Sequence, residues 1–223
     1  KLLQRGCCLF QAVAVLAIIR WNGLLRKTTL WAHNYYETLS CEPRMKKSKN
    51  VRLLTAAEIK KNLERMSREI LRQNKASDSL AFIGIRTRGL FLAQRVRGMI
   101  QKSQHKEIPL GEMDISLYRD DLNALLPEGK VDHTSIPFDI NNKTIILFDD
   151  VLHTGRTVRA AVDHLIDLGR PKAIHLAVLI DRGGREFPIA ANFIAKKINL
   201  PQGGEVRLKL KEVDGRDEVV VGK

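Results

Sequence analysis

The sequence predicts an α/β fold: a twisted, mainly parallel sheet flanked by helices, with a small β hood near the C-terminus. Three short apolar runs, residues 80–85, 144–148 and 173–180, are typical of parallel strands that are buried on both faces. The first two runs are each followed by a glycine-containing loop and a segment with helical apolar spacing. With 223 residues, 44% of them hydrophobic, the chain is long enough for one such domain.

The first helix is predicted to begin at a capping box. Thr55 is placed to act as N-cap, Glu58 follows three residues later, and Leu54 and Ile59 are spaced for a hydrophobic staple. One face of this helix should be buried, and it carries Ile59, Leu63, Met66 and Ile70. The opposite face carries Lys60, Lys61, Arg65, Arg68 and Arg72, interleaved with Glu64 and Glu69. Such a face is typical of solvent exposure, and it is also suited to a polyanion.

A strand–loop–helix unit is predicted next. The strand at 80–85 leads into the cationic loop 86–89 and a helix over 90–101, an arrangement that can bind an anion at the helix N-terminus. Residues 113–118 alternate like a strand, and the segment 119–138 shows no periodicity. We expect this segment to be a lid with Arg119 near its hinge; the alternative is a flexible insertion.

The central stretch of the chain predicts a phosphate site. The strand at 144–148 is followed by Asp149 and Asp150, at the edge where open α/β sheets bind ligands. A helix is predicted over 158–168, and Gly155 just before it lets the backbone approach a ligand closely. The helix N-terminus and its free N–H groups favour a phosphate at the turn Thr154-Gly155-Arg156-Thr157.

The two carboxylates indicate that this ligand also carries hydroxyl groups or a metal ion. Asp149 and Asp150 would repel a bare phosphate, whereas carboxylates accept hydrogen bonds from a ribose diol and attract Mg²⁺. Each of these features alone is also ordinary turn chemistry. Together, and in this order, they favour a phosphorylated sugar.

The C-terminal third predicts one more buried strand and the hood. The strand at 173–180 ends in a segment with two consecutive glycines, residues 181–186, whose backbone groups can meet a ligand edge. Short strands are then predicted over 193–198, 206–212 and 218–221. The sequence shows no metal-ligand cluster, and His153 is expected to fill the phosphate turn rather than to bind ligand.

Charge and cysteine content limit the partners and the compartment. The net charge of +13 indicates a polyanionic partner, which substrate phosphates or nucleic acid would satisfy. No cysteine follows Cys41, so the rest of the chain has no disulfide framework, thiolate metal site or cysteine nucleophile. We expect a cytoplasmic protein with no membrane partner.

Residues 1–44 differ from the rest of the chain. They contain all three cysteines and both tryptophans, and Met45 is the first methionine. We therefore expect residues 1–44 to be upstream sequence read in frame or a disordered extension, and residues 45–223 to form the functional domain. The alternative is a targeting segment, because residues 6–19 are apolar, although that run is short for a membrane span.

Residues 145–157, two apolar-flanked acids followed by a Thr-Gly-x-Thr loop, resemble the phosphoribosyl pyrophosphate motif of type I phosphoribosyltransferases. Over about 51–221, the chain resembles the bifunctional pyrimidine operon attenuation and uracil phosphoribosyltransferase family. That resemblance rests on Thr87-Arg88-Gly89, Tyr118-Arg119-Asp120-Asp121-Leu122, Gly169-Arg170-Pro171 and Asp181-Arg182-Gly183. It implies the type I phosphoribosyltransferase fold with a hood over the base, and a homo-oligomer, dimer or higher.

The resemblance implies a reaction in which uracil displaces pyrophosphate from phosphoribosyl pyrophosphate to give UMP, with Mg²⁺ carried by the pyrophosphate and no metal site of the protein's own. The implied catalytic residues are Asp149, Asp150 and Arg119. The implied substrate-binding residues are Thr87, Arg88, Asp149, Asp150, Val151, Leu152, His153, Thr154, Gly155, Arg156, Thr157, Ile180, Asp181 and Arg182. Thr87 and Arg88 would receive pyrophosphate, Arg119 would clamp it, and the backbone near 180–185 would read uracil.

The family resemblance also implies UMP-dependent binding of a leader mRNA hairpin, which regulates pyrimidine biosynthetic genes by transcription attenuation. The implied RNA-binding residues are Arg65, Arg68, Arg72, Arg182, Arg185, Lys196 and Lys197. The chain departs from the family pattern on this side, with Arg68 and Gly184 where the family has histidines. Two alternatives stay open: a purely catalytic phosphoribosyltransferase for uracil or a purine base, and an RNA binder whose former active site senses nucleotides.

Overall fold

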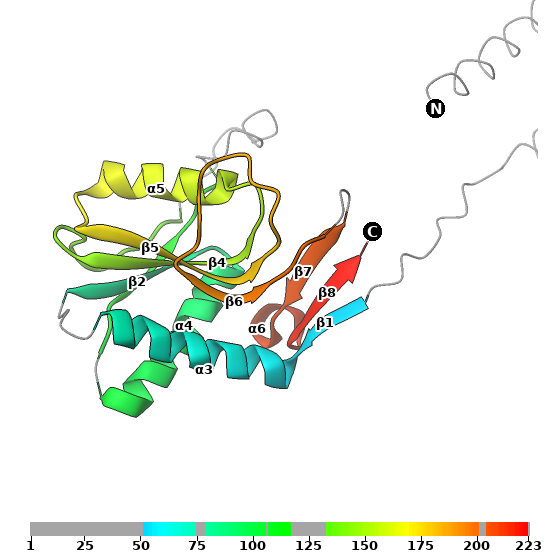
Figure 1. Cartoon of the computed structure of the whole chain (residues 1–223). Helices are drawn as coiled ribbons and strands as arrows, with labels where there is room; N and C mark the ends of the chain where they lie inside the picture. The colour runs from blue at the N-terminus through cyan, green and yellow to red at the C-terminus, as the bar shows by residue number, and fades with distance from the viewer. Residues whose placement is uncertain (1–50, 75–78, 106, 117–132, 201–203, 223) are drawn as a thin grey trace, which may run out of the picture. The chain divides into compact units, whose positions relative to one another are not determined.

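The structure, a computed structural model, describes residues 51–74, 79–105, 107–116, 133–200 and 204–222 (Figure 1). The expected boundary at residue 44 and the lid residue Arg119 lie outside these residues. In chain order the elements are β1 (Val51–Thr55), α3 (Ala56–Gln73), β2 (Leu80–Ile85), α4 (Arg88–Gln104), β3 (Leu110–Met113), β4 (Thr144–Leu152), α5 (Arg156–Leu168), β5 (Ala173–Asp181), β6 (Phe193–Lys197), β7 (Glu205–Lys209), α6 (Lys211–Asp214) and β8 (Glu218–Gly222).

Five strands form one parallel sheet in the order β3-β2-β4-β5-β6, which confirms the predicted fold class. Successive side chains of β4 enter two different cores: Ile146 and Phe148 pack with α3 and α4, whereas Ile145 and Leu147 pack with α5. Figure 1 shows α3 and α4 below the sheet and α5 above it. The unbroken apolar runs of the sequence therefore belong to strands covered on both faces.

The direction of the connections reverses between β2 and β4. From β2 the chain runs through α4 to β3 at one edge, and from β4 it runs through α5 to β5 on the other side. The pairing of β2 with β4 ends at Gly84 and Phe148, and beyond these residues the two strands no longer pair with each other. Ligands of open α/β sheets bind at the carboxyl ends of the strands at such a switch point, so this is the place to look for the site.

Helix α3 begins as the sequence predicts. The backbone N–H of Glu58 donates to Thr55 Oγ1 at 3.4 Å, and the N–H of Thr55 donates to Glu58 Oε2 at 2.8 Å, which completes the capping box. The predicted apolar face is buried, with Ile59 and Ile70 fully inaccessible. That face packs α3 against α4 and the sheet.

The strand predicted over 113–118 lies too far along the chain. The structure places β3 at Leu110–Met113, where it pairs with β2. The Asp114 carboxylate accepts hydrogen bonds from the backbone N–H of Ser116 at 2.9 Å and from its hydroxyl at 2.6 Å. This side-chain turn ends the strand just after Met113, although the apolar alternation continues to Ile115.

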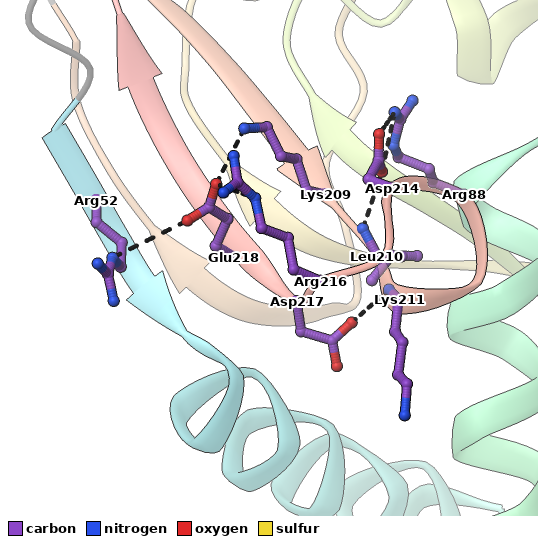
Figure 2. A network of polar contacts seen from close by, with 9 residues as sticks. All are labelled: Arg52, Arg88, Lys209, Leu210, Lys211, Asp214, Arg216, Asp217 and Glu218. Atoms are coloured by element: carbon purple, nitrogen blue, oxygen red, sulfur yellow. Dashed lines mark hydrogen bonds and ion pairs between the residues drawn. The ribbon is translucent and has the colours of Figure 1, made fainter.

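A second, antiparallel sheet has the order β1-β8-β7. With the short helix α6 it forms a unit that we name the annex. The predicted hood of three C-terminal strands is partly wrong: β6 joins the parallel sheet, and β1, from the other end of the described chain, pairs with β8. Glu218 of β8 pairs with three basic side chains, those of Lys209, Arg216 and Arg52 (Figure 2). Its Oε1 lies 3.0 Å from Lys209 Nζ and 3.0 Å from Arg216 Nε, and its Oε2 lies 4.0 Å from Arg52 Nε.

Across the part of the chain that the structure describes, no helix combines the length and apolar character needed to span a membrane.

Candidate active site

The acid pair lies inside β4, not after its end. The sequence predicts that the strand stops at Phe148, but pairing with β5 continues through Leu152, opposite Asp181. The predicted end is therefore wrong by four residues, because β4 keeps a partner on the β5 side after it has left β2. Asp149 and Asp150 consequently occupy a rigid strand segment that has already separated from β2 at the switch point.

The two carboxylates have different surroundings. Asp149 is 6% exposed, and its Oδ1 accepts the backbone N–H of Asp150 at 2.8 Å. Asp150 is half-buried, and its Oδ1 accepts the N–H of Val151 at 2.8 Å. Because neighbouring strand residues point to opposite faces, only one acid can point to a given side of the sheet. Asp150 is thus the more accessible of the two to a ligand.

The predicted phosphate turn leads directly into α5. Gly155 is buried with a φ of 95°, and an added Cβ would lie 3.3 Å from Ile189, so a side chain is disfavoured on both grounds. The helix begins at Arg156, two residues before the predicted start, and the N–H of Arg156 donates to Thr154 Oγ1 at 3.3 Å. Half-buried Thr154 and Thr157 flank this helix N-terminus, a suitable place for a phosphate.

The Arg156 side chain points to the 186–187 segment. Its Nε donates to Glu186 Oε2 at 2.8 Å, and its guanidinium lies 5.5 Å from the Phe187 ring centre, beside that of Arg159 at 5.4 Å. The carbonyl of Thr154 accepts the N–H of Glu186 at 2.9 Å. The segment after β5 therefore supports the phosphate turn, and it holds the side chain of Arg156.

The loop after β2 lies against β4. An added Cβ at Gly89 would meet the Phe148 carbonyl oxygen at 2.4 Å and Asp149 Cα at 3.3 Å. At Gly84 of β2, an added Cβ would lie 2.3 Å from Leu90 Cα of α4. The close packing of β2 against α4 therefore also requires a glycine. Two glycines thus bring the first turn of α4, with Thr87 just before it, to the acid pair. The two loops that the sequence predicts to bind anions therefore lie close together.

Arg88, the first residue of α4, extends toward the annex. Its Nη2 donates to both carboxylate oxygens of Asp214, at 3.1 and 3.3 Å (Figure 2). Its Nε is buried and has no hydrogen-bond partner among the described residues. The peptide bond between Arg86 and Thr87, just before α4, is cis. The Nε of Arg86 lies 3.1 Å from Oε1 of Glu112. Sequence reasoning missed Asp214, since it stands 126 residues from Arg88 and no local pattern links them.

The loop after β5 is held by Asp181 and Arg185. Oδ1 of Asp181 accepts the N–H of Gly183 at 3.0 Å and Nη2 of Arg185 at 2.6 Å. Burial opposes ionisation of Asp181, but these two donors outweigh it and keep the pKa of the carboxyl below its ordinary value. Nη1 of Arg185 donates to the His153 carbonyl at 2.8 Å, so the β5 loop also braces the phosphate turn.

The other predicted ligand residues of this region are mainly structural in their contacts. Ile180 is fully buried opposite Val151, and Leu152 is 1% exposed. The carbonyl of Leu152 accepts the N–H of Arg182 at 3.1 Å, which joins the ends of β4 and β5. A ligand would meet these residues through backbone groups, as the sequence predicts for the base.

His153 lies against the loop that follows β5. An added Cβ at Gly184, whose φ is 75°, would lie 3.0 Å from His153 Nε2. Burial, together with the cationic Arg182 and Arg185, lowers the pKa of His153, against a smaller opposite effect of Glu186. Gly184 thus leaves room for the imidazole ring of His153.

The comparisons with known proteins identify the family. The Phosphoribosyl transferase domain family matches residues 51–211. The Bifunctional protein PyrR of Thermus aquaticus is 50% identical over 167 residues, which cover 75% of this chain and 92% of that protein. The chain belongs to the PyrR family of phosphoribosyltransferases. The Bifunctional protein PyrR of Listeria monocytogenes serotype 4b is 47% identical over 78% of this chain and 96% of that protein.

Solved structures of phosphoribosyltransferases share the fold of this PyrR family member. A hypoxanthine phosphoribosyltransferase of Trypanosoma cruzi, in a ternary substrates complex, superposes with a TM-score of 0.63 at 16% identity, over 79% of this chain and 96% of that one. One from Staphylococcus aureus gives 0.59 at 19% identity, over 78% and 92%. The predicted type I phosphoribosyltransferase fold is confirmed.

Five of the seven basic residues expected to bind RNA, namely Arg65, Arg68, Arg72, Lys196 and Lys197, lie on α3 and β6. Nη2 of Arg65 donates to the carbonyls of Ile194 at 2.9 Å and Ala195 at 2.7 Å, which holds α3 against β6. The exposed Arg68, Lys196 and Lys197 are therefore on neighbouring elements.

Besides Arg65, two of the expected RNA-binding arginines already have protein partners. Arg72 pairs with Glu69 at 2.6 Å, and hydrogen bonds from Arg72 and Gln73 lower the pKa of Glu69 to about 2. Arg185 is half-buried and binds the phosphate turn. Arg182 is half-buried, with its Nε inaccessible. The exposed part of the predicted RNA surface is thus the α3–β6 side.

Proposed function

We propose that the chain is a uracil phosphoribosyltransferase that also regulates pyrimidine biosynthetic genes by binding leader mRNA in the presence of UMP. One observation carries the catalytic part: Gly89 packs the cationic first turn of α4 against Phe148 and Asp149, next to the phosphate turn of β4 and α5. This arrangement supplies two anion sites with an acid pair between them. The family membership supports the choice of base and the regulatory role.

In this proposal, phosphoribosyl pyrophosphate lies across the carboxyl ends of β2 and β4. Its 5′-phosphate binds the turn from Thr154 to Thr157, and its pyrophosphate binds Thr87 and Arg88. Asp149 and Asp150 accept hydrogen bonds from the ribose hydroxyls and stabilise the positive charge of an oxocarbenium-like transition state. No covalent nucleophile is required, because positioning and charge stabilisation are sufficient for this displacement.

Uracil is read by the loop after β5. Gly183 and Gly184 have positive φ values of 70° and 75°, so this loop turns tightly and presents backbone groups. The base accordingly meets N–H and C=O groups near Ile180 and Arg182. Arg119, outside the described residues, is proposed to clamp pyrophosphate from the lid.

Mg²⁺ enters with the substrate. Among the residues that the structure describes, no group of three or more His, Cys, Asp or Glu side chains could hold a metal. Mg²⁺ is commonly bound by one or two carboxylates together with substrate phosphates, and the half-buried Asp150 fits that set. The ion would neutralise the leaving pyrophosphate.

The proposal extends to partners and compartment. The leader mRNA hairpin binds the exposed basic residues of α3 and β6, the protein forms a homo-oligomer, and it acts in the cytoplasm, where transcripts and phosphoribosyl pyrophosphate are found. Residues 1–44 are not needed for either activity.

A base-specificity assay tests the catalytic proposal. The chain starting at Met45 is offered uracil, hypoxanthine, guanine and orotate, each with phosphoribosyl pyrophosphate and Mg²⁺. We expect turnover with uracil alone. Turnover with a purine would support a purely catalytic relative, and no turnover from folded protein would favour an RNA binder that senses nucleotides.

RNA binding is tested by its salt dependence. We expect UMP to tighten binding to a pyrimidine leader hairpin, and Lys197→Gln to weaken it while lowering the slope of log K against log[salt] by about one. Arg207→Gln in the annex, an exposed arginine paired with Glu205, is the control. Equal, weak binding to any RNA would contradict the regulatory proposal.

A further inference from the structure

Two arginines on one face of α4 hold the annex. Arg88 and Arg95 are seven residues apart, two helical turns, so their side chains emerge on the same side. Arg95 Nη2 lies 2.6 Å from Glu212 Oε2 and 2.8 Å from Asp217 Oδ1, and its Nε and Nη1 make further bonds of 2.9 Å to the same two acids. Arg88 binds Asp214, which lies with Glu212 in the short helix α6.

The two arginines differ in how many of their donors are in use. Arg95 binds two carboxylates through all three of its nitrogen atoms, and its side chain is 20% exposed. Among the residues that the structure describes, Arg88 finds partners through Nη2 only, and its side chain is 34% exposed. A guanidinium has five N–H donors in a rigid plane. Arg95 uses four of them, so Arg88 keeps more donors for a second anion than Arg95 does.

Asp214 is itself fixed in place. Its Oδ2 accepts the backbone N–H of Leu210 at 3.0 Å, as Figure 2 shows, while both oxygens face Arg88. The hydrogen bond from Leu210 and the contact with Arg88 keep the pKa of Asp214 below its ordinary value, although burial acts in the opposite direction. The Asp214 carboxyl is therefore charged at neutral pH. A fixed anion therefore restrains the guanidinium of Arg88 at one amino group.

We propose that Asp214 of the annex is a positioning residue that presets Arg88 for the pyrophosphate group of phosphoribosyl pyrophosphate. The inference rests on the proposed function, which places pyrophosphate at Thr87 and Arg88. Without Asp214, the long Arg88 side chain would have to be ordered at the moment of binding, an entropic cost that lowers affinity. The annex then takes part in substrate binding, 126 residues away from the loop that it serves.

Equilibrium binding is the test, because it does not depend on which base reacts. Phosphoribosyl pyrophosphate, inorganic pyrophosphate and UMP are titrated, with Mg²⁺, into the full chain and followed by calorimetry. We expect Asp214→Ala to weaken binding of the first two about three- to tenfold and to leave UMP, which lacks pyrophosphate, unchanged. Asp214→Asn, which can still accept from Leu210, should fall between and carries the test if the alanine variant fails to fold.

Two further variants separate positioning from simple support of the annex. Glu212→Gln changes the same helix but contacts Arg95, and it should bind all three ligands as wild type does. In an Arg88→Met background, Asp214→Asn should have no further effect on pyrophosphate, because the coupled partner is gone.

Three results would overturn the inference: wild-type affinity in the Asp214 variants, an equal loss in Glu212→Gln, or tighter pyrophosphate binding without Asp214. Failure of the proposed function is distinguishable. If the wild-type protein binds phosphoribosyl pyrophosphate but makes no UMP from uracil, only the assignment of uracil as the base is refuted. If it binds neither phosphoribosyl pyrophosphate nor pyrophosphate, both the proposed function and the role of Asp214 are refuted.

Discussion

The parallel sheet and the annex are stabilised in different ways. The sheet is assembled from consecutive strand–helix units, and its strands are buried on both faces by apolar side chains. The annex pairs β1 with β8, from opposite ends of the described chain, and is tied to α4 by Arg88 and Arg95. The sheet thus depends on apolar burial on both of its faces, and the annex also depends on charged pairs with α4.

This difference predicts which substitutions should change function most. The acid pair and both anion turns lie on the sheet, where the backbone is fixed by packing. Arg88 connects this site to the annex through Asp214. Substitutions in the sheet should therefore abolish chemistry or folding, and substitutions in the annex should produce graded effects.

The largest effect is expected at the acid pair. The double variant Asp149→Asn and Asp150→Asn removes the two negative charges that we propose stabilise the developing cation, so turnover should fall by about two to three orders of magnitude. Circular dichroism should show that the fold is intact, since the amide can keep the backbone hydrogen bonds. Wild-type turnover in the double variant would refute the assignment.

The next effect is expected at the contact between the two turns. Gly89→Ala places a Cβ 2.4 Å from the Phe148 carbonyl oxygen, which must displace α4 from β4 and should cost about 1–3 kcal/mol of unfolding free energy along with most activity. Gly98→Ala, in the same helix, meets nothing within 4 Å and should be neutral or stabilising by up to about 1 kcal/mol. Denaturant titration measures both. Equal behaviour of the two would contradict the packing argument.

A smaller effect is expected at the annex anchor. Arg95→Met leaves Glu212 and Asp217 without their shared cation and should lower the unfolding free energy by about 2 kcal/mol. Amide exchange should rise first in β7 and β8. The control is Arg207→Met, whose pair with Glu205 is exposed and should contribute at most about 0.5 kcal/mol. If the sheet and the annex lost protection together, the distinction between them would be wrong.

The smallest effect is a pH dependence concentrated in the annex. Hydrogen bonds from the protein lower the pKa values of Glu212, Asp214 and Asp217. A carboxyl whose folded-state pKa lies below its unfolded value stabilises the fold in full above about pH 4.5, and this contribution is lost as pH falls through the folded-state pKa. Exchange measured between pH 6 and 3 should show the annex opening before the sheet. A flat profile, or loss of the sheet first, would contradict this expectation.

Several elements could be predicted from the sequence because their signals are local. The capping box of α3 needs only Thr55 and Glu58, and the buried strands β2, β4 and β5 show as unbroken apolar runs. The turn at Gly155 followed by an apolar helical pattern predicted the start of α5 to within two residues. In each case, residues that interact are close in the chain.

The errors concern partners that are distant in the chain. The end of β4 was misplaced because pairing with β5 extends it past Phe148, and β6 was assigned to the hood because its own residues do not reveal which strand lies beside it. The end of β3 is set by the turn at Asp114, which overrides a continuing apolar alternation. Such pairings depend on the folded sheet, not on the segment itself.

The sequence by itself determined the fold class, the acid pair, the two glycine-containing turns and the family resemblance, because each is encoded by neighbouring residues with a fixed spacing. Only the tertiary structure decided that the two turns meet through Gly89, that Arg185 braces the phosphate turn, and that Asp214 holds Arg88. Those contacts join residues from 32 to 126 positions apart, or depend on the absence of a side chain at a close approach. The physical reason is that such contacts exist only after burial of the apolar faces has brought distant segments together.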